Sequence, residues 1–135
     1  MKKLILSLSL LISTSVFAQD PPSLQFLMAQ MGQKVQLMMT GILYDNFELI
    51  AVSADYVLDH PKPANDLPLI KQELGAEMAN FKRIDGIVHS SAQAIFDAAN
   101  DHNMNEVARN YGKMMRGRVE CHDTFRDRLR IILHR

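Results

Sequence analysis

The chain has 135 residues, with 15 Lys and Arg against 15 Asp and Glu, so its formal net charge is zero. This balance excludes the basic excess that is typical of proteins binding nucleic acid. The length suffices for one domain with its own core, and the single cysteine excludes a framework of intrachain disulfides.

Residues 1–18 have the pattern of a secretory signal peptide. Lys2 and Lys3 form a short basic region, and the apolar stretch that follows ends at the small-residue pattern Val16-Phe17-Ala18. We expect the mature chain to be a single exported, periplasmic domain over residues 19–135. Since no later run of about 18 apolar residues occurs, the sequence predicts no membrane span after signal removal.

The first two predicted helices follow one another through a short turn. The first begins near Ser23, and its apolar residues recur every three or four positions from 24 to 42. After a turn, Asp45-Asn46-Phe47-Glu48 resembles a capping box and predicts the start of the second helix. That helix ends at Asp59-His60-Pro61, because proline disfavours helix at the preceding residue.

The second half of the chain predicts two longer helices. A loop over residues 62–68 precedes a third helix, expected from about 69 to 99, and Asn103-x-x-Glu106 has the spacing of another capping box. The apolar stripe of the fourth helix continues through Ile132. Four amphipathic helices with short connections predict an all-α fold, an antiparallel up-down four-helix bundle.

Cys121 and His122, on the predicted fourth helix, match the last two positions of the motif C-x-x-C-H. In that motif two thiols attach haem covalently and the histidine coordinates iron. Arg118 stands at the first cysteine position. Because positions 118, 121 and 122 are three and four residues apart, their side chains lie on one helix face. Cys121 thus keeps the position of a single thioether, and His122 that of an axial ligand.

From residue 105 onward the chain resembles the C-terminal helix of the cytochrome c-prime family, the class II cytochromes c. The matching residues are Val107-Ala108, Cys121-His122-Asp123, Phe125 and Arg126. The resemblance implies a four-helix bundle in which His122 is the proximal iron ligand and Cys121 the thioether residue. It also implies electron transfer or the binding of a small gas. Arg118 departs from the family pattern, since the family has a cysteine there.

A related periplasmic four-helix cytochrome b binds haem without a thioether, through a methionine on helix one and a histidine on helix four. Met28 or Met31 is the matching distal ligand here, and Arg118, Phe125 and Arg126 complete the expected cofactor-binding residues. The expected cofactor is one haem, either c-type with a single thioether or b-type. The expected partners are a redox protein or a small gaseous ligand, and the family's dimers imply a homodimer through helix one.

Two alternatives to haem remain open. Thioether and thiolate sulfur suit Cu(I), so Met28, Met31, Met114, Met115 and Cys121 are candidate copper ligands. Loss of the first cysteine of the motif instead favours a haem-free interaction module that binds other proteins in the periplasm.

Other kinds of site find no support in the sequence. The remaining histidines, His60, His89, His102 and His134, show no i,i+4 pairing typical of zinc ligands. No Ser-His-Asp arrangement or phosphate-binding loop stands out, so the sequence predicts no enzyme.

Overall fold

The computed structural model describes residues 21–134, and the expected signal peptide over residues 1–18 lies outside this range. All regular elements within residues 21–134 are helical, which confirms the all-α prediction. Over the same range, no helix combines the length and apolarity needed to cross a membrane. The elements are α1 (Leu24–Leu43), α2 (Phe47–Leu58), α3 (Leu67–Leu74), the 3-10 helix η1 (Gly75–Glu77), α4 (Met78–Asn100), α5 (Met104–Phe125) and α6 (Arg130–Leu133).

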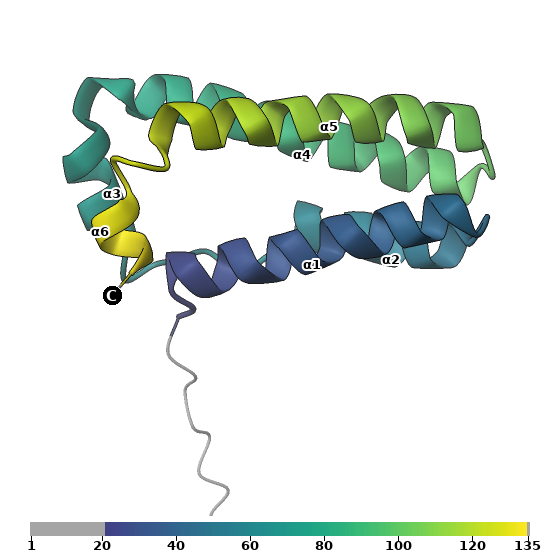
Figure 1. Cartoon of the computed structure of the whole chain (residues 1–135), viewed down its shortest axis with the longest axis horizontal. Helices are drawn as coiled ribbons and strands as arrows, with labels where there is room; N and C mark the ends of the chain where they lie inside the picture. Colours follow the sequence, from purple (N-terminus) through teal and green to yellow (C-terminus); the bar gives the residue numbers. More distant parts are fainter. Residues whose placement is uncertain (1–20, 135) are drawn as a thin grey trace, which may run out of the picture.

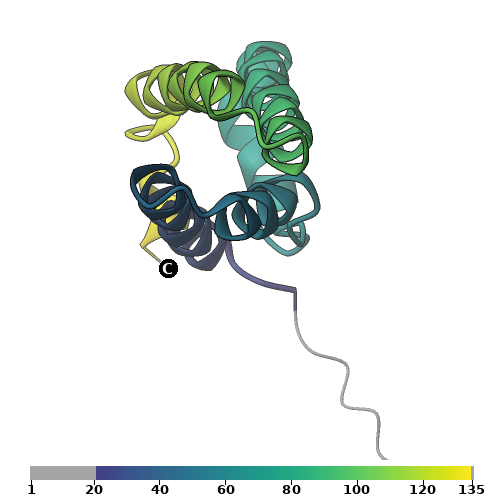
Figure 2. The ribbon, with the colours of Figure 1, turned by 90° about the vertical axis from the view of Figure 1, so that its right-hand side faces the viewer.

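The long helices α1, α2, α4 and α5 lie side by side (Figure 1). Helix α1 packs along α2, α2 along α4, and α4 along α5. Figure 2 shows these helices as a ring in which α1 and α5 are also neighbours, but this pair makes the fewest contacts of the four. The short helices α3 and α6 lie at the end of the molecule where α1 begins and α5 ends (Figure 1).

Two side chains cap the start of α1. The hydroxyl oxygen of Ser23 accepts a hydrogen bond from the N–H of Phe26 at 3.2 Å. The carboxylate of Asp66 accepts one from the N–H of Leu24 at 2.7 Å. A carboxylate at this position also complements the positive end of the helix dipole. The loop before α3 is therefore tied to the first turn of α1.

Asparagines cap α2 and α5; the capping-box spacing predicts the cap of α5 correctly and that of α2 one residue too early, at Asp45. The side chain of Asn46 accepts a hydrogen bond from the N–H of Leu49 at 2.9 Å. The side chain of Asn103 accepts one from the N–H of Glu106 at 3.2 Å. The cap of α2 is thus Asn46, one residue after Asp45. Asp45 and His102, which precede the two caps, both have a φ of 53°. Each reverses the chain through one residue in the left-handed region.

The predicted third helix, from about 69 to 99, is interrupted. Gly75 has a φ of 51°, a conformation that glycine adopts at little cost, and α3 ends at Leu74 before it. The helix resumes as α4 after η1. Arg128 donates hydrogen bonds to the carbonyl oxygens of Glu73 and Leu74, which satisfies acceptors that the end of α3 leaves open.

The predicted fourth helix does not run straight through Ile132. Helix α5 ends at Phe125, residues 126–129 form a turn, and α6 follows. The turn lets Leu129 and Ile132 bury in one apolar cluster with Leu24 of α1. Burial of these side chains stabilises the bent arrangement, because a buried Leu or Ile contributes about 1.5–3 kcal/mol.

Two apolar clusters form the core. The central cluster lies along the four long helices and includes Met38, Ile50, Ile95 and Met114, all 0% exposed. The end cluster lies at α3 and α6 and consists of Leu24, Ile70, Leu74, Ile84, Phe125, Leu129 and Ile132. Tyr111 of α5 donates its hydroxyl hydrogen to the carbonyl oxygen of Val35 of α1 at 3.2 Å. This buried bond joins α1 to α5 beside the central cluster.

Gly41 allows the close approach of α1 to α2. A Cβ atom at this position would lie 2.6 Å from Cγ1 of Ile50 and 3.0 Å from the carbonyl oxygen of Asn46. We expect Gly41→Ala to lower the free energy of unfolding by about 1–3 kcal/mol, as overpacking does. Gly32→Ala, where nothing lies within 4 Å of the new atom, should raise it by up to about 1 kcal/mol. Urea unfolding followed by circular dichroism measures both, and similar effects of the two changes would contradict this packing.

Candidate cofactor cavity

A cavity of about 410 Å³ lies between α1, α4, α5 and α6, and its walls are mostly apolar. Its volume is within the range of ligand-binding pockets, about 300–1,000 Å³. The residues that the sequence predicts as cofactor-binding all line this cavity: Met28, Met31, Arg118, Cys121, His122, Phe125 and Arg126. The structure therefore brings together residues up to 98 positions apart, from Met28 to Arg126.

The sulfur and nitrogen donors come from different walls of the cavity. Cys121 and His122 lie on α5, and the thioethers of Met28 and Met31 lie on α1. Met28 packs against the end cluster together with Cys121. Met31 belongs to the central cluster and is only 4% exposed. The two methionines therefore have different surroundings although both border the cavity.

His122 borders the cavity while part of its surface stays exposed to solvent. Partial burial lowers the pKa of its imidazole below the ordinary 6.5, and the positive charges of Arg118 and Arg126 lower it further, against the opposing effect of Asp123. The imidazole is therefore neutral at pH 7, and a neutral ring nitrogen can coordinate a metal.

Arg118, which replaces the first cysteine of the motif, is half-buried in the wall of the cavity. Burial lowers the pKa of its guanidinium, although arginine stays charged in proteins. No hydrogen bond or ion pair joins this guanidinium to another residue between 21 and 134. An unpaired cation at a mostly apolar cavity favours a ligand that carries negative charge at its edge.

Cys121 is a free, half-buried thiol. Burial raises its pKa, the carboxylates of Asp85 and Glu120 raise it further, and Arg118 acts in the opposite direction. The thiol is therefore protonated near neutral pH. Since the thiolate is the nucleophilic form, Cys121 is a weak nucleophile in this environment.

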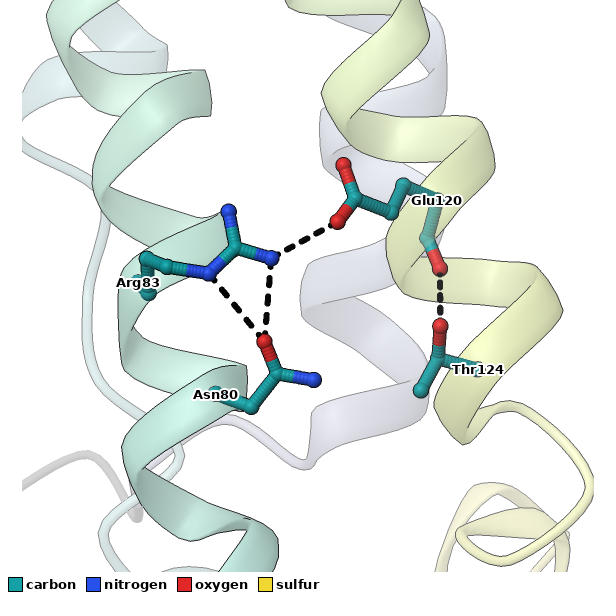
Figure 3. A network of polar contacts seen from close by, with 4 residues as sticks. All are labelled: Asn80, Arg83, Glu120 and Thr124. Atoms are coloured by element: carbon teal, nitrogen blue, oxygen red, sulfur yellow. Dashed lines mark hydrogen bonds and ion pairs between the residues drawn. The ribbon is translucent and has the colours of Figure 1, made fainter.

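Polar contacts between α4 and α5 hold the turn that carries Cys121 and His122 (Figure 3). Arg83 of α4 forms an ion pair with Glu120 of α5 at 2.7 Å, and the same Arg83 nitrogen donates to Asn80 at 2.9 Å. On the other side of His122, the hydroxyl of Thr124 donates to the carbonyl oxygen of Glu120 at 2.7 Å. Exposed ion pairs contribute only about 0–1 kcal/mol, so this network adds little to the stability of the fold.

The structure adds an α4 wall that the sequence analysis missed. Phe81, Asp85 and Val88 line the cavity, and their spacing of four and three residues places them on one helix face. The ring of Phe81 meets that of Phe125 edge to face, with centres 5.4 Å apart. Asp85 is the residue in the sequence that could have indicated this wall, because it is a carboxylate in an otherwise apolar stripe.

Not all of the candidate copper ligands come together. Met28, Met31 and Cys121 line the cavity, but Met114 is 0% exposed in the central cluster. Met115 borders a separate groove of about 460 Å³ between α1 and α5, to which Arg118 and His122 also contribute. The sulfur donors of the cavity are therefore one thiol and two thioethers.

No group of three or more His, Cys, Asp or Glu residues suited to hold a metal ion occurs within the described range 21–134. Comparisons with protein-family models, with curated sequences and with solved structures give no match to this chain. The function of this chain is therefore inferred from the cavity itself.

After burial, the positive charge of Arg118 is the next cause that lowers the pKa of His122. Arg118→Gln removes a positive charge that lowers the pKa of His122, so we expect that pKa to rise. A titration of the imidazole signals by NMR measures the change. Arg116→Gln is the matched control, because Arg116 is exposed and is not among the charges that act on His122. An unchanged pKa in Arg118→Gln would contradict the arrangement.

The same shift makes stability depend on pH. Since the pKa of His122 is lower in the folded protein than the unfolded value of about 6.5, the unfolded chain binds more protons below that pH. We expect the ligand-free protein to lose stability as the pH falls below about 6.5. The loss should be smaller in Arg118→Gln, and thermal melts at a series of pH values measure it.

Proposed function

We propose that this protein is an exported, periplasmic haem-binding protein of the cytochrome c-prime kind, in which His122 is an axial iron ligand. The observation that carries the proposal is the cavity of about 410 Å³, lined by His122, Cys121 and two methionines from the opposite wall. The pattern of residues 1–18 supports export.

The cavity residues fit the chemistry of haem. Its macrocycle is flat and apolar, which suits the mostly apolar walls and the Phe125 ring. Its two carboxylates suit the cationic Arg118 and Arg126, both of which border the cavity. When bound, haem supplies an iron centre for electron transfer or for binding a small gas. The protein contributes the neutral imidazole, the mostly apolar walls and the nearby positive charge.

We infer that Met28 is the second axial ligand. It is half-buried, lines the cavity and packs with Cys121 against the end cluster. Met31 is buried in the central cluster, so its side chain serves packing. With His122 and Met28 as iron ligands, a bound haem would favour electron transfer with a redox partner over binding of a gas.

Attachment of the haem is limited to one thioether at most, because Arg118 stands where the motif has its first cysteine. The raised pKa of Cys121 keeps this thiol protonated and therefore weakly nucleophilic. Both observations favour a b-type haem that is held by coordination and packing. A c-type haem with the single thioether through Cys121 is the alternative.

We also propose how the long helices are arranged and how two chains associate. Consecutive long helices run in opposite directions in Figure 1, which supports an antiparallel up-down four-helix bundle. Phe26 and Leu37 are 54% and 38% exposed, and their spacing of 11 residues places them on one stripe of α1. This apolar stripe supports a homodimer through α1.

The absorption spectrum of the purified protein tests haem binding directly. The protein is produced with export in a host that has active haem-maturation machinery. We expect a Soret band near one haem per chain, and its loss or a complete change of spin state in His122→Ala. Bound copper without a Soret band would support the second candidate, a Cu(I) protein using the three sulfur donors of the cavity.

A compact protein that binds neither haem nor copper, and that added haem fails to reconstitute, would contradict the proposal and support a haem-free interaction module. Attachment is read from the same sample. Complete extraction of the haem by acid acetone is expected for the b-type form. Haem that stays with the chain on a denaturing gel would show the thioether through Cys121.

Separate substitutions distinguish the two methionines. Met28→Ala should convert a low-spin haem spectrum to a high-spin one with a modest loss of stability, because an axial ligand is removed. Met31→Ala should leave the spectrum unchanged and lower the free energy of unfolding by about 2–5 kcal/mol, as for other buried large-to-small changes. Visible spectra and urea unfolding measure the two effects, and an unchanged spectrum in both variants would exclude methionine ligation.

A further inference from the structure

Two histidines outside the cavity lie against each other. His60, which follows the end of α2, and His89 of α4 have ring centres 5.3 Å apart, with their planes inclined at 43°. They are 29 positions apart in the sequence and are brought together by the packing of α2 on α4. Neither ring is buried.

Hydrogen bonds fix the same tautomer in both rings. Nδ1 of His60 lies 2.8 Å from the carbonyl oxygen of Pro61, and Nδ1 of His89 lies 3.0 Å from the carbonyl oxygen of Asp85. Because a carbonyl oxygen only accepts hydrogen bonds, each neutral ring carries its hydrogen on Nδ1. Nε2 of each ring is left with a free lone pair. This is the arrangement typical of metal-binding histidines, whose other nitrogen donates to a carbonyl or carboxylate.

We propose that His60 and His89 form a binding site for one divalent late first-row transition metal ion, held by the two Nε2 atoms and completed by water. Imidazole ligands suit copper, nickel and zinc, and Cu²⁺ binds nitrogen sites most tightly in this series. The site has two protein ligands, in agreement with the lack of any group of three or more metal-binding residues between 21 and 134. Neither histidine lines the cavity, although Asp85, which contacts His89, does.

The spacing of the rings fits a shared ion. With metal–nitrogen distances of about 2.0–2.1 Å, two imidazoles on one tetrahedral ion have ring centres roughly 5 Å apart, close to the 5.3 Å found here. The carboxylate of Asp85 lies 3.6 Å from Nδ1 of His89. Its negative charge favours a cation at the site and increases the donor strength of the imidazole.

The contact between the two rings does not by itself require that both carry their hydrogen on Nδ1. Two imidazoles would pack against each other with either nitrogen protonated, whereas metal binding needs both lone pairs on the same kind of atom, Nε2. Both residues are partly exposed, which lets water reach the remaining coordination positions. A bound ion would also join the end of α2 to α4 and therefore stabilise the folded chain.

Calorimetric titration of the purified full-length protein with NiCl2 at pH 7.5 tests the site. We expect one ion per chain. The affinity for nickel should be at least about tenfold lower in His60→Asn and in His89→Asn, because loss of a residue that only supports a ligand already lowers metal affinity by about 10–100-fold. His102→Asn is the matched control. His102 is exposed and packs on Phe47, away from the pair, so this change should leave the affinity as it is.

A measurement on the unaltered protein keeps the test independent of how the variants fold. Substoichiometric CuCl2 should broaden the imidazole NMR signals of His60 and His89 before that of His102. Equal broadening of the three signals, or nickel affinities that are the same in all four proteins, would overturn the proposal.

Discussion

The turn over residues 126–129 is the feature on which the candidate site depends. It ends α5 at Phe125 and directs α6 onto α1, where Leu129 and Ile132 enter the end cluster beside Leu24. Helix α6 thereby closes one end of the space between α1 and α5. Those two helices contact each other least among the neighbouring long pairs, and the cavity between them has α1, α4 and α5 as walls and α6 at its end.

Charge in this cavity is arranged at some cost to stability. Arg118 is half-buried without an ion-pair partner among residues 21–134, and removing a charge from water is unfavourable unless it is paired. Its aliphatic stem covers apolar surface, which offsets part of this cost. The positive charge of Arg118 lowers the pKa of His122 and opposes the rise in the pKa of Cys121. Unpaired charge of this kind is typical of functional sites.

Local signals in the sequence were sufficient for the start of α5 and for each face of the site. Asn103 caps α5 through a side chain that reaches Glu106 three residues ahead, and this spacing is visible in the sequence. The cap of α2 is Asn46, one residue after the Asp45 that the same spacing predicts. Cys121 and His122 belong to one helix turn, as do Met28 and Met31 on theirs. These two faces meet at one cavity because of how the helices pack. The apolar stripes of both helices indicate this packing but do not determine it.

Contacts between distant residues account for what the sequence did not predict. The end of α5 at Phe125 depends on burial of Leu129 against α1, and Arg128 reaches the end of α3, more than 50 positions earlier. The pairing of His60 with His89 is likewise invisible to any search for i,i+4 spacing, because it results from the packing of α2 on α4.

The cap of α1 has a consequence for the order of folding. The N–H of Leu24 bonds to Asp66, 42 positions later, so this part of the cap forms only after a long loop has closed. Loop closure slows the formation of contacts between distant residues. The hairpin of α4 and α5, whose partners are close in sequence, can form early. We therefore expect the first turn of α1 to acquire its complete cap late, next to Met28 in the wall opposite His122.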